Sequence, residues 1–170
     1  MTQAYMPESK STEWGTPRRV FDPWNSEFNF TLDVCAVDWN TKVPAHWFSP
    51  QVDGLRQSWR GERAWCNPPY GSKNIAQWLA KAVAEANAGA TSVLLLPNTT
   101  DTQWFHEFVW DAGDNRPRRG IEVRFIKGRI NFDLPPGFDG RKDGNVKGSM
   151  LVITRPIVPG IVVPCQFCGK

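Results

Sequence analysis

The amino-acid sequence predicts a single α/β domain that has a mostly parallel sheet with helices on both faces. Its length of 170 residues suits one compact domain with a proper core. Segments typical of strands and of helices alternate through the middle of the chain, and this order favours parallel strands. The apolar run 92–96 is typical of a parallel strand that is buried on both faces.

We divide the chain into a flexible leader at 1–13, one domain at 14–155 and a weakly structured tail at 156–170. The leader is polar and lacks the apolar core of a signal peptide. No apolar run reaches the length that a membrane span needs. We therefore expect a cytoplasmic protein that makes no contact with a membrane.

The first half of the domain supplies two strands and a helix. Residues 28–34 alternate between apolar and polar side chains, which predicts a strand that ends near Asp33. Residues 37–60 contain prolines and glycine as breakers and predict an irregular segment. A short second strand at 63–66 ends at two prolines, which cannot continue a sheet. Apolar residues at helical spacing then predict a helix at 74–88.

The second half continues with strand 92–96, a helix at 102–110 and a basic loop at 111–120. Strands follow at 121–126 and 149–154. The long loop between them is rich in glycine, proline and charged residues, and loops of this length in a small domain are usually functional or mobile. Parallel sheets bind their ligands outside the carboxyl ends of the strands. Because Asp33 and Asn67 both follow predicted strands, we expect them to flank one crevice if those strands are neighbours.

Composition narrows the function only slightly. The net charge of +3 is compatible with a polyanionic partner but does not demonstrate one. Nine tryptophans suit a core or a site for flat ligands.

Cys165 and Cys168 resemble half of a zinc site, but no second pair completes it, so we predict no metal. Cys35 and Cys66 are expected to be packed thiols.

The tetrapeptide Asn67-Pro68-Pro69-Tyr70 is the most informative motif. It could be a plain proline turn, but a turn does not explain its place at the end of a strand. An aromatic amine is a poor nucleophile, and two acceptors that bind its N–H groups can direct its lone pair at an electrophile. The side-chain oxygen of Asn67 and the carbonyl of Pro68 can be those acceptors, held by rigid proline backbone. Tyr70 can stack on a base that has left the duplex.

This tetrapeptide resembles the catalytic motif of amino-methyltransferases, which act on adenine N6, cytosine N4 or a glutamine amide. The chain from 14 to 155 more narrowly resembles the phage DNA N-6-adenine-methyltransferase (Dam-like) family. The matching segments, in order, are Trp14-Gly15-Thr16-Pro17, 28–36, Asp53-Gly54-Leu55 with Trp59, Trp65 to Tyr70, Leu95-Leu96-Pro97 with Thr102, Trp104-Phe105-His106, and 128–132.

The resemblance implies a Rossmann-like class I methyltransferase domain that transfers a methyl group from S-adenosylmethionine to adenine N6 at specific sites in double-stranded DNA. It also implies a role in protecting phage DNA from restriction in the host cytoplasm. No obligate protein partner is evident from the sequence. One alternative keeps the motif but acts on cytosine N4, RNA or a protein glutamine. Another is a DNA-binding protein without catalytic activity, because the glycine-rich turn usual after the first strand is absent.

The resemblance also assigns residues to the cofactor. Thr16 and Pro17 would line its methionine end, Asp33 would lie near its amino-acid moiety, and Asp53 would accept a hydrogen bond from its adenine, on which Leu55 packs. Asp38 is a possible contact to the ribose. The complete implied set is Trp14, Thr16, Pro17, Asp33, Cys35, Ala36, Asp53, Gly54 and Leu55.

Five basic residues are candidates for contacts to DNA phosphates, which would make binding dependent on salt. Arg129 lies inside one of the matching segments, and Lys73 directly follows the catalytic turn. The remaining candidates are Arg119, Arg141 and Lys142. Any of them could instead belong to a solvated surface.

Overall fold

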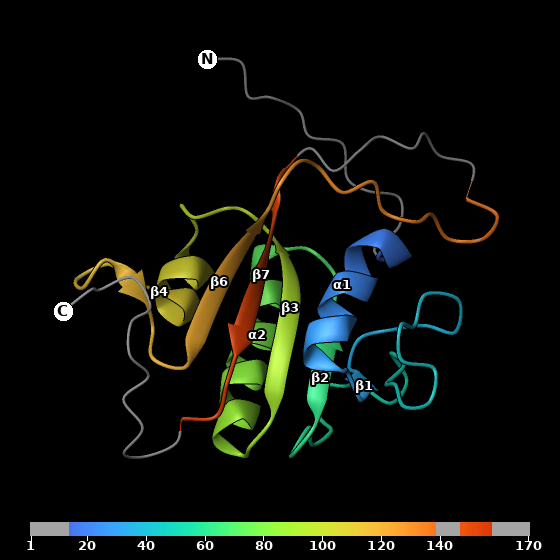
Figure 1. Cartoon of the computed structure of the whole chain (residues 1–170), viewed down its shortest axis with the longest axis horizontal. Coiled ribbons are helices and arrows are strands. Elements are labelled where there is room, and N and C mark those ends of the chain that lie inside the picture. The colour runs from blue at the N-terminus through green and yellow to red at the C-terminus, as the bar shows by residue number, and fades with distance from the viewer. Residues whose placement is uncertain (1–13, 139–146, 158–170) are drawn as a thin grey trace.

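The computed structural model describes residues 14–138 and 147–157, which form a mixed five-stranded sheet with helices on both faces (Figure 1). The strands are ordered β1-β2-β3-β7-β6. Their bounds are β1 Leu32–Asp33, β2 Arg63–Cys66, β3 Thr91–Pro97, β6 Ile121–Ile126 and β7 Ser149–Thr154. Strands β1, β2 and β3 pair in parallel, whereas β7 runs antiparallel to both β3 and β6. Only β7 therefore opposes the other four strands, which confirms a mostly parallel sheet.

Helix α1 (Arg18–Phe28) covers one face of the sheet, and α2 (Ser72–Asn87) covers the other together with the π-helix η1 (Phe105–Val109) (Figure 1). The two-residue period of the strands separates two cores. In β3, Val93 and Leu95 pack in the core that contains Phe21 of α1. Leu94 and Leu96, which point to the opposite face, pack in the core that contains Leu79 of α2. The expected helices on both faces are thus confirmed.

Several predicted elements match the structure closely. Strands β2, β6 and β7 have the expected bounds, and α2 begins at Ser72, two residues before its predicted start. Residues 37–60, all of them described, contain no helix or strand, as predicted. The leader and the tail from residue 158 lie outside the described residues.

Two predicted elements are wrong in part. Phe28 does not begin a strand but ends α1, because Asn29 adopts a left-handed conformation with φ of 49° and terminates the helix. The strand is only Leu32–Asp33. The helix expected at 102–110 is reduced to one turn and η1, and Trp110 already belongs to β4 (Trp110–Asp111). This strand pairs with β5 (Arg116–Pro117) in a small separate hairpin within the predicted basic loop.

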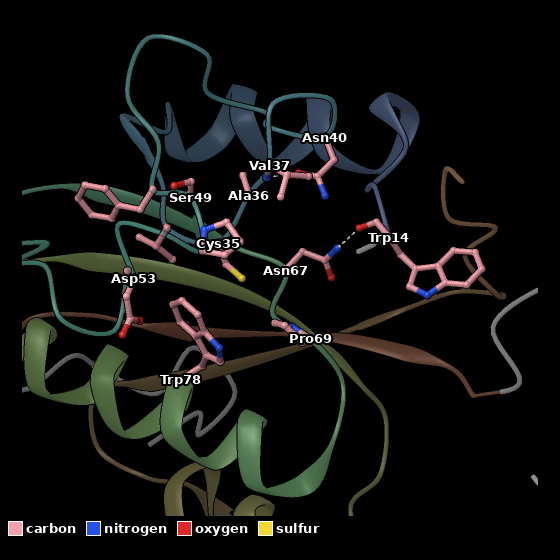
Figure 2. A pocket seen from close by; sticks show the side chains of 14 residues that line it. Trp14, Cys35, Ala36, Val37, Asn40, Ser49, Asp53, Asn67, Pro69 and Trp78 are labelled. Carbon is pink, nitrogen blue, oxygen red and sulfur yellow. Dashed lines mark hydrogen bonds between the residues drawn. The ribbon is translucent and has the colours of Figure 1, made fainter. Parts of the chain in front are cut away.

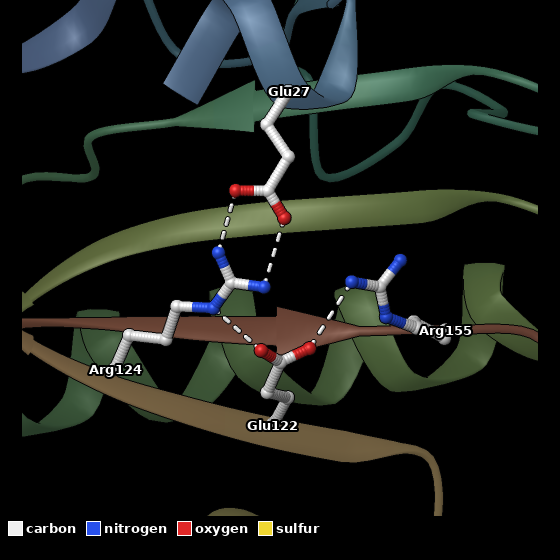
Figure 3. A network of polar contacts seen from close by, with 4 residues as sticks. All are labelled: Glu27, Glu122, Arg124 and Arg155. Atoms are coloured by element: carbon white, nitrogen blue, oxygen red, sulfur yellow. Dashed lines mark hydrogen bonds and ion pairs between the residues drawn. The ribbon is translucent and has the colours of Figure 1, made fainter. Parts of the chain in front are cut away.

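A network of charged residues fastens α1 to the sheet (Figure 3). Arg124 of β6 donates two hydrogen bonds to the Glu27 carboxylate, at 2.6 and 2.8 Å, and a third to Glu122. Arg155, which follows β7, donates to the other oxygen of Glu122 at 3.1 Å. The hydrogen bond from Arg124 lowers the pKa of Glu27, so the pair stays charged at neutral pH. This bidentate geometry holds the position of α1 relative to β6.

Within the described part of the chain, every helix is too short or too polar to cross a lipid bilayer.

Candidate active site

A pocket opens at the carboxyl edge of β1 and β2 (Figure 2). Its volume of about 340 Å³ lies in the range of sites that bind small molecules. Seven of the residues that the sequence assigned to the cofactor or to catalysis line it, namely Trp14, Cys35, Ala36, Asp53, Gly54, Asn67 and Pro69.

The parallel pairing of β1 and β2 explains why these residues meet. Asp33 lies opposite Trp65, and the Val34 N–H donates to the Trp65 carbonyl just beyond the paired residues. The chain therefore leaves both strands at the same edge of the sheet. This places the loop after β1 against the turn that begins at Asn67, as the sequence predicted for a crevice between neighbouring strands.

The Asn67 side chain is anchored at its nitrogen end. Its Nδ2 donates a hydrogen bond of 2.9 Å to the main-chain carbonyl of Trp14 (Figure 2). An amide carries its donor and its acceptor at opposite ends, so Oδ1 remains available to accept. The adjacent prolines restrict the main chain, and Pro68 is buried. The turn therefore presents an oriented acceptor beside the pocket.

Tyr70 offers an aromatic ring at the surface beside this turn. Its side chain is 38% exposed, and its ring meets that of Phe132 edge-on with centroids 6.1 Å apart. Desolvation of the hydroxyl raises the pKa of this phenol, so it remains neutral at physiological pH. A neutral, half-exposed ring suits stacking on a flat partner better than proton transfer.

Asp33 is buried and serves the loop that lines the pocket. Its Oδ2 accepts a hydrogen bond of 2.8 Å from the Lys42 N–H, and its Oδ1 accepts one of 3.4 Å from the Cys35 N–H. Burial raises the pKa of this carboxyl to about 6. Asp33 is not among the residues that line the pocket, and Asp38 is exposed and does not line it either.

Thr16 and Pro17 lie where the N-terminal segment enters α1. Pro17 is the N-cap residue of the helix and is buried. The Thr16 side chain is also buried, yet its Oγ1 has no hydrogen-bond partner among the described residues. A buried hydroxyl without a partner is costly. Neither Thr16 nor Pro17 is among the residues that line the pocket.

The turn Asp53-Gly54-Leu55 forms another wall of the pocket. Asp53 has a left-handed φ of 57°, and its carboxylate accepts from the Leu55 N–H at 3.2 Å and pairs with Arg56 at 3.1 Å. A Cβ atom on Gly54 would lie 2.1 Å from the Val34 carbonyl oxygen, so only glycine fits. Leu55 packs against the apolar core and does not line the pocket.

The predicted DNA-contacting residues are divided between the two edges of the sheet. Lys73 is exposed in the first turn of α2, and Arg129 is exposed after the carboxyl end of β6. Both therefore lie at the edge that carries Asn67. Arg119 precedes β6 and lies at the opposite edge. Arg141 and Lys142 are outside the described residues.

The described residues contain no group of three or more side chains that could hold a metal ion. Cys165 and Cys168, the pair that resembles half of a zinc site, lie outside them.

Sequence reasoning missed half of the pocket wall. Most of the missed residues come from loops, whose sequences have no periodicity. Asn40 offered one signal, because asparagine is typical of turns, and its side chain accepts a hydrogen bond of 2.8 Å from the Val37 N–H. Trp78 was recognised only as part of the apolar face of a helix. The missed residues are Val34, Val37, Asn40, Phe48, Ser49, Pro50 and Trp78.

Comparison with known proteins agrees with this geometry. The family model described as DNA N-6-adenine-methyltransferase (Dam) matches residues 3–164. A DNA N-6-adenine-methyltransferase of Haemophilus phage HP1 (strain HP1c1) is 30% identical over 162 residues, which cover 94% of this chain and 87% of the relative. The five-stranded sheet with helices on both faces is consistent with a Rossmann-like methyltransferase fold. The chain belongs to the DNA N-6-adenine-methyltransferase (Dam) family, whose members are enzymes that methylate adenine in DNA.

Proposed function

We propose that this protein transfers a methyl group from S-adenosylmethionine to N6 of an adenine extruded from double-stranded DNA, with Asn67-Pro68-Pro69-Tyr70 as its catalytic motif. The observation that carries the proposal is the Asn67 amide at the wall of the pocket, with its nitrogen bound to the Trp14 carbonyl and its oxygen left to accept.

The pocket fits a cofactor of this kind. The Asp53 carboxylate lines the pocket and can only accept, so it suits the amino group of an adenine. The family resemblance assigns the unpartnered Thr16 hydroxyl, which is buried beside α1, to the methionine end. Cys35, Ala36 and Gly54 line the space between with small side chains. When bound, S-adenosylmethionine would supply an electrophilic methyl group on a sulfonium and would leave as S-adenosylhomocysteine when its bond from sulfur to that methyl group breaks.

The protein activates the amine of the target base. Asn67 Oδ1 and the Pro68 carbonyl accept hydrogen bonds from its two N–H groups, which draws the nitrogen toward tetrahedral geometry and frees its lone pair. These acceptors need no rearrangement during the reaction, because the prolines and Trp14 already hold them. One of the two amine protons leaves to water after the new N–C bond has formed, so no histidine base is required.

Substrate binding uses the surroundings of the motif. The exposed Tyr70 ring stacks on the extruded adenine. Lys73 and Arg129, which lie at the same edge, neutralise phosphates of the flanking DNA. Arg119 lies at the other edge, so it can contact only a duplex that wraps around the domain.

Incubation with unmethylated duplex DNA and S-adenosylmethionine labelled on its methyl group tests the reaction. We expect labelled N6-methyladenine. Replacement of Asn67 by Ala should lower the transfer rate by about two or more orders of magnitude while the Kd for S-adenosylhomocysteine changes little. Replacement of Asn98, an exposed asparagine just after β3, by Ala is the matched control.

Other outcomes separate the alternatives. Labelled N4-methylcytosine, RNA or protein would assign the motif to a different amine. Failure to bind S-adenosylhomocysteine would indicate a DNA-binding protein without catalytic activity. A preserved rate in the Asn67→Ala variant together with lost cofactor affinity would overturn the role given to Asn67.

We also infer a biological role from the phage origin of the relative. Methylation at specific sites in the host cytoplasm would protect phage DNA from restriction. Host DNA from cells that express the protein should then resist endonucleases that N6-methyladenine blocks, and the pattern of methylated sites would reveal the recognition sequence. Methylation without sequence preference would argue against a site-specific enzyme.

A further inference from the structure

The orientation of the Asn67 amide depends on a main-chain atom of another segment. The Trp14 carbonyl accepts from Nδ2 at 2.9 Å. A flipped amide would instead place Oδ1 against this carbonyl, and two acceptors in contact repel each other. The Trp14 carbonyl therefore determines which end of the amide faces away from it (Figure 2).

Trp14 belongs to no helix or strand, and its position is set by the next residue. Gly15 forms an isolated antiparallel bridge with Asp133, in which the Gly15 N–H donates at 3.0 Å and the Asp133 N–H donates at 2.8 Å. The Trp14 ring also meets the Phe138 ring edge-on at 5.8 Å. The segment 128–138, which follows β6, thus fixes the carbonyl that anchors Asn67.

The bridge leaves little room for any residue but glycine at position 15. A Cβ atom there would lie 2.9 Å from the Trp39 ring and 3.2 Å from the Asp133 Cβ. The same segment reaches the other end of the catalytic motif, because Phe132 packs edge-on against Tyr70. The segment 128–138 therefore supports both Asn67, through Trp14 and Gly15, and Tyr70, through Phe132.

We propose that the Gly15–Asp133 bridge is a positioning device that holds the Asn67 amide with Oδ1 toward the substrate amine. The inference rests on the proposed function and extends it to residues that touch neither substrate nor cofactor. A loosened bridge lets the amide flip and move. Because small misplacements of a reacting group cost up to about 100-fold in rate, we expect losses of about 10- to 100-fold in kcat.

Replacement of Asp133 by Pro removes one main-chain donor of the bridge, whereas Asp133→Ala keeps it. We expect Asp133→Ala to retain most of kcat and Asp133→Pro to lose about 10- to 100-fold. Gly15→Ala disturbs the bridge from the other side, and Gly148→Ala is its control, because a methyl group there meets only Asn98 atoms at 3.8 Å or more. Equal kcat values for Asp133→Pro and Asp133→Ala would overturn the proposal.

A second background separates positioning from general damage to the fold. An aspartate at position 67 has an acceptor at both ends, so it cannot donate to the Trp14 carbonyl and has no anchor there for the bridge to position. The fold-loss in kcat caused by Asp133→Pro should therefore be at least about fivefold smaller in the Asn67→Asp background than in the Asn67 background, as measured by a double-mutant cycle. Equal losses in both backgrounds would show a merely structural role.

A measurement without turnover completes the test. The side-chain amide protons of Asn67, identified in 15N spectra by their loss in Asn67→Asp, should exchange slowly with solvent in the unmodified chain and faster after Asp133→Pro. Unchanged exchange would contradict the proposal. The exchange measurement needs no methylation. A protein that fails to methylate DNA would therefore refute the proposed function, while the effect of the bridge on the Asn67 amide could still be measured.

Discussion

Gly54 offers the sharpest test of the pocket, because its effect follows from a single distance. A Cβ atom at this position would lie 2.1 Å from the Val34 carbonyl oxygen, whereas ordinary contacts begin at 3.4 Å. The Gly54→Ala variant must therefore separate the turn at 53–55 from the end of β1 by about 1 Å, an overpacking that typically costs about 1–3 kcal/mol.

The same shift breaks a buried hydrogen bond. Trp59, whose side chain is fully buried, donates from Nε1 to the Gly54 carbonyl at 2.9 Å. A buried donor that loses its partner costs about 1–3 kcal/mol more. We expect a total of about 4 kcal/mol, which for a domain of this size lowers Tm by about 10 °C.

Thermal unfolding followed by circular dichroism measures this effect, with Gly61→Ala as the control. Gly61 has a positive φ of 75° but open space around a new methyl group, so it reports backbone strain alone, of about 1–2 kcal/mol. Because Val34, Asp53 and Gly54 all line the pocket, calorimetry should also show weaker binding of S-adenosylhomocysteine to Gly54→Ala below its Tm. Equal Tm values for the two variants would refute the reasoning.

Three further predictions concern charge and stacking. Tyr70→Phe should keep kcat within about threefold, because the phenol is neutral. Tyr70→Ala should lower the rate of single-turnover methylation by about 10- to 100-fold, since stacking contributes about 1–3 kcal/mol per base. A large loss of rate in the Tyr70→Phe variant would implicate the hydroxyl. The pKa of Asp33 rises from 3.8 to about 6 on folding, so its charged form destabilises the fold above pH 6, and this cost disappears as the pH falls below 4. Relative to Asp33→Asn, the free energy of unfolding in urea should therefore fall by about 2 kcal/mol from pH 4 to pH 6, and a constant difference would contradict the shift. Arg124→Leu should lower the free energy of unfolding by only about 1–2 kcal/mol, because solvent partly screens the ion pair with Glu27, which is 45% exposed. In 0.5 M salt, the difference in unfolding free energy between the variant and the unmodified protein should become smaller.

The sequence predicted most of the sheet and the edge that carries the site. Strands β2, β6 and β7 were readable because their apolar runs are short and bounded by breakers, and Asn67 was identifiable because its motif combines a rare proline pair with a strand end. Helix α1 was not predicted. Its last residue, Phe28, belongs to the segment that alternates like a strand, and Pro23 lies inside the helix.

The rest of the site depends on contacts between distant segments, which local patterns do not encode. Asn67 meets Trp14 across more than fifty positions of the chain, and Gly15 meets Asp133 across more than a hundred. The role of Asp33 was also not readable, because a buried carboxylate that organises a loop has the same sequence as one that faces a ligand. Only the fold distinguishes them.

The position of β7 has a consequence for biosynthesis. This strand is fully buried and lies between β3 and β6, yet it is the last of the five to be synthesised. Until residues 149–154 emerge from the ribosome, β3 and β6 each expose an unpaired edge, which is the kind of surface that recruits other chains. The nascent protein therefore completes its sheet by inserting a central strand after the other four have been synthesised, and chains that stop before residue 149 should aggregate rather than form a smaller stable domain.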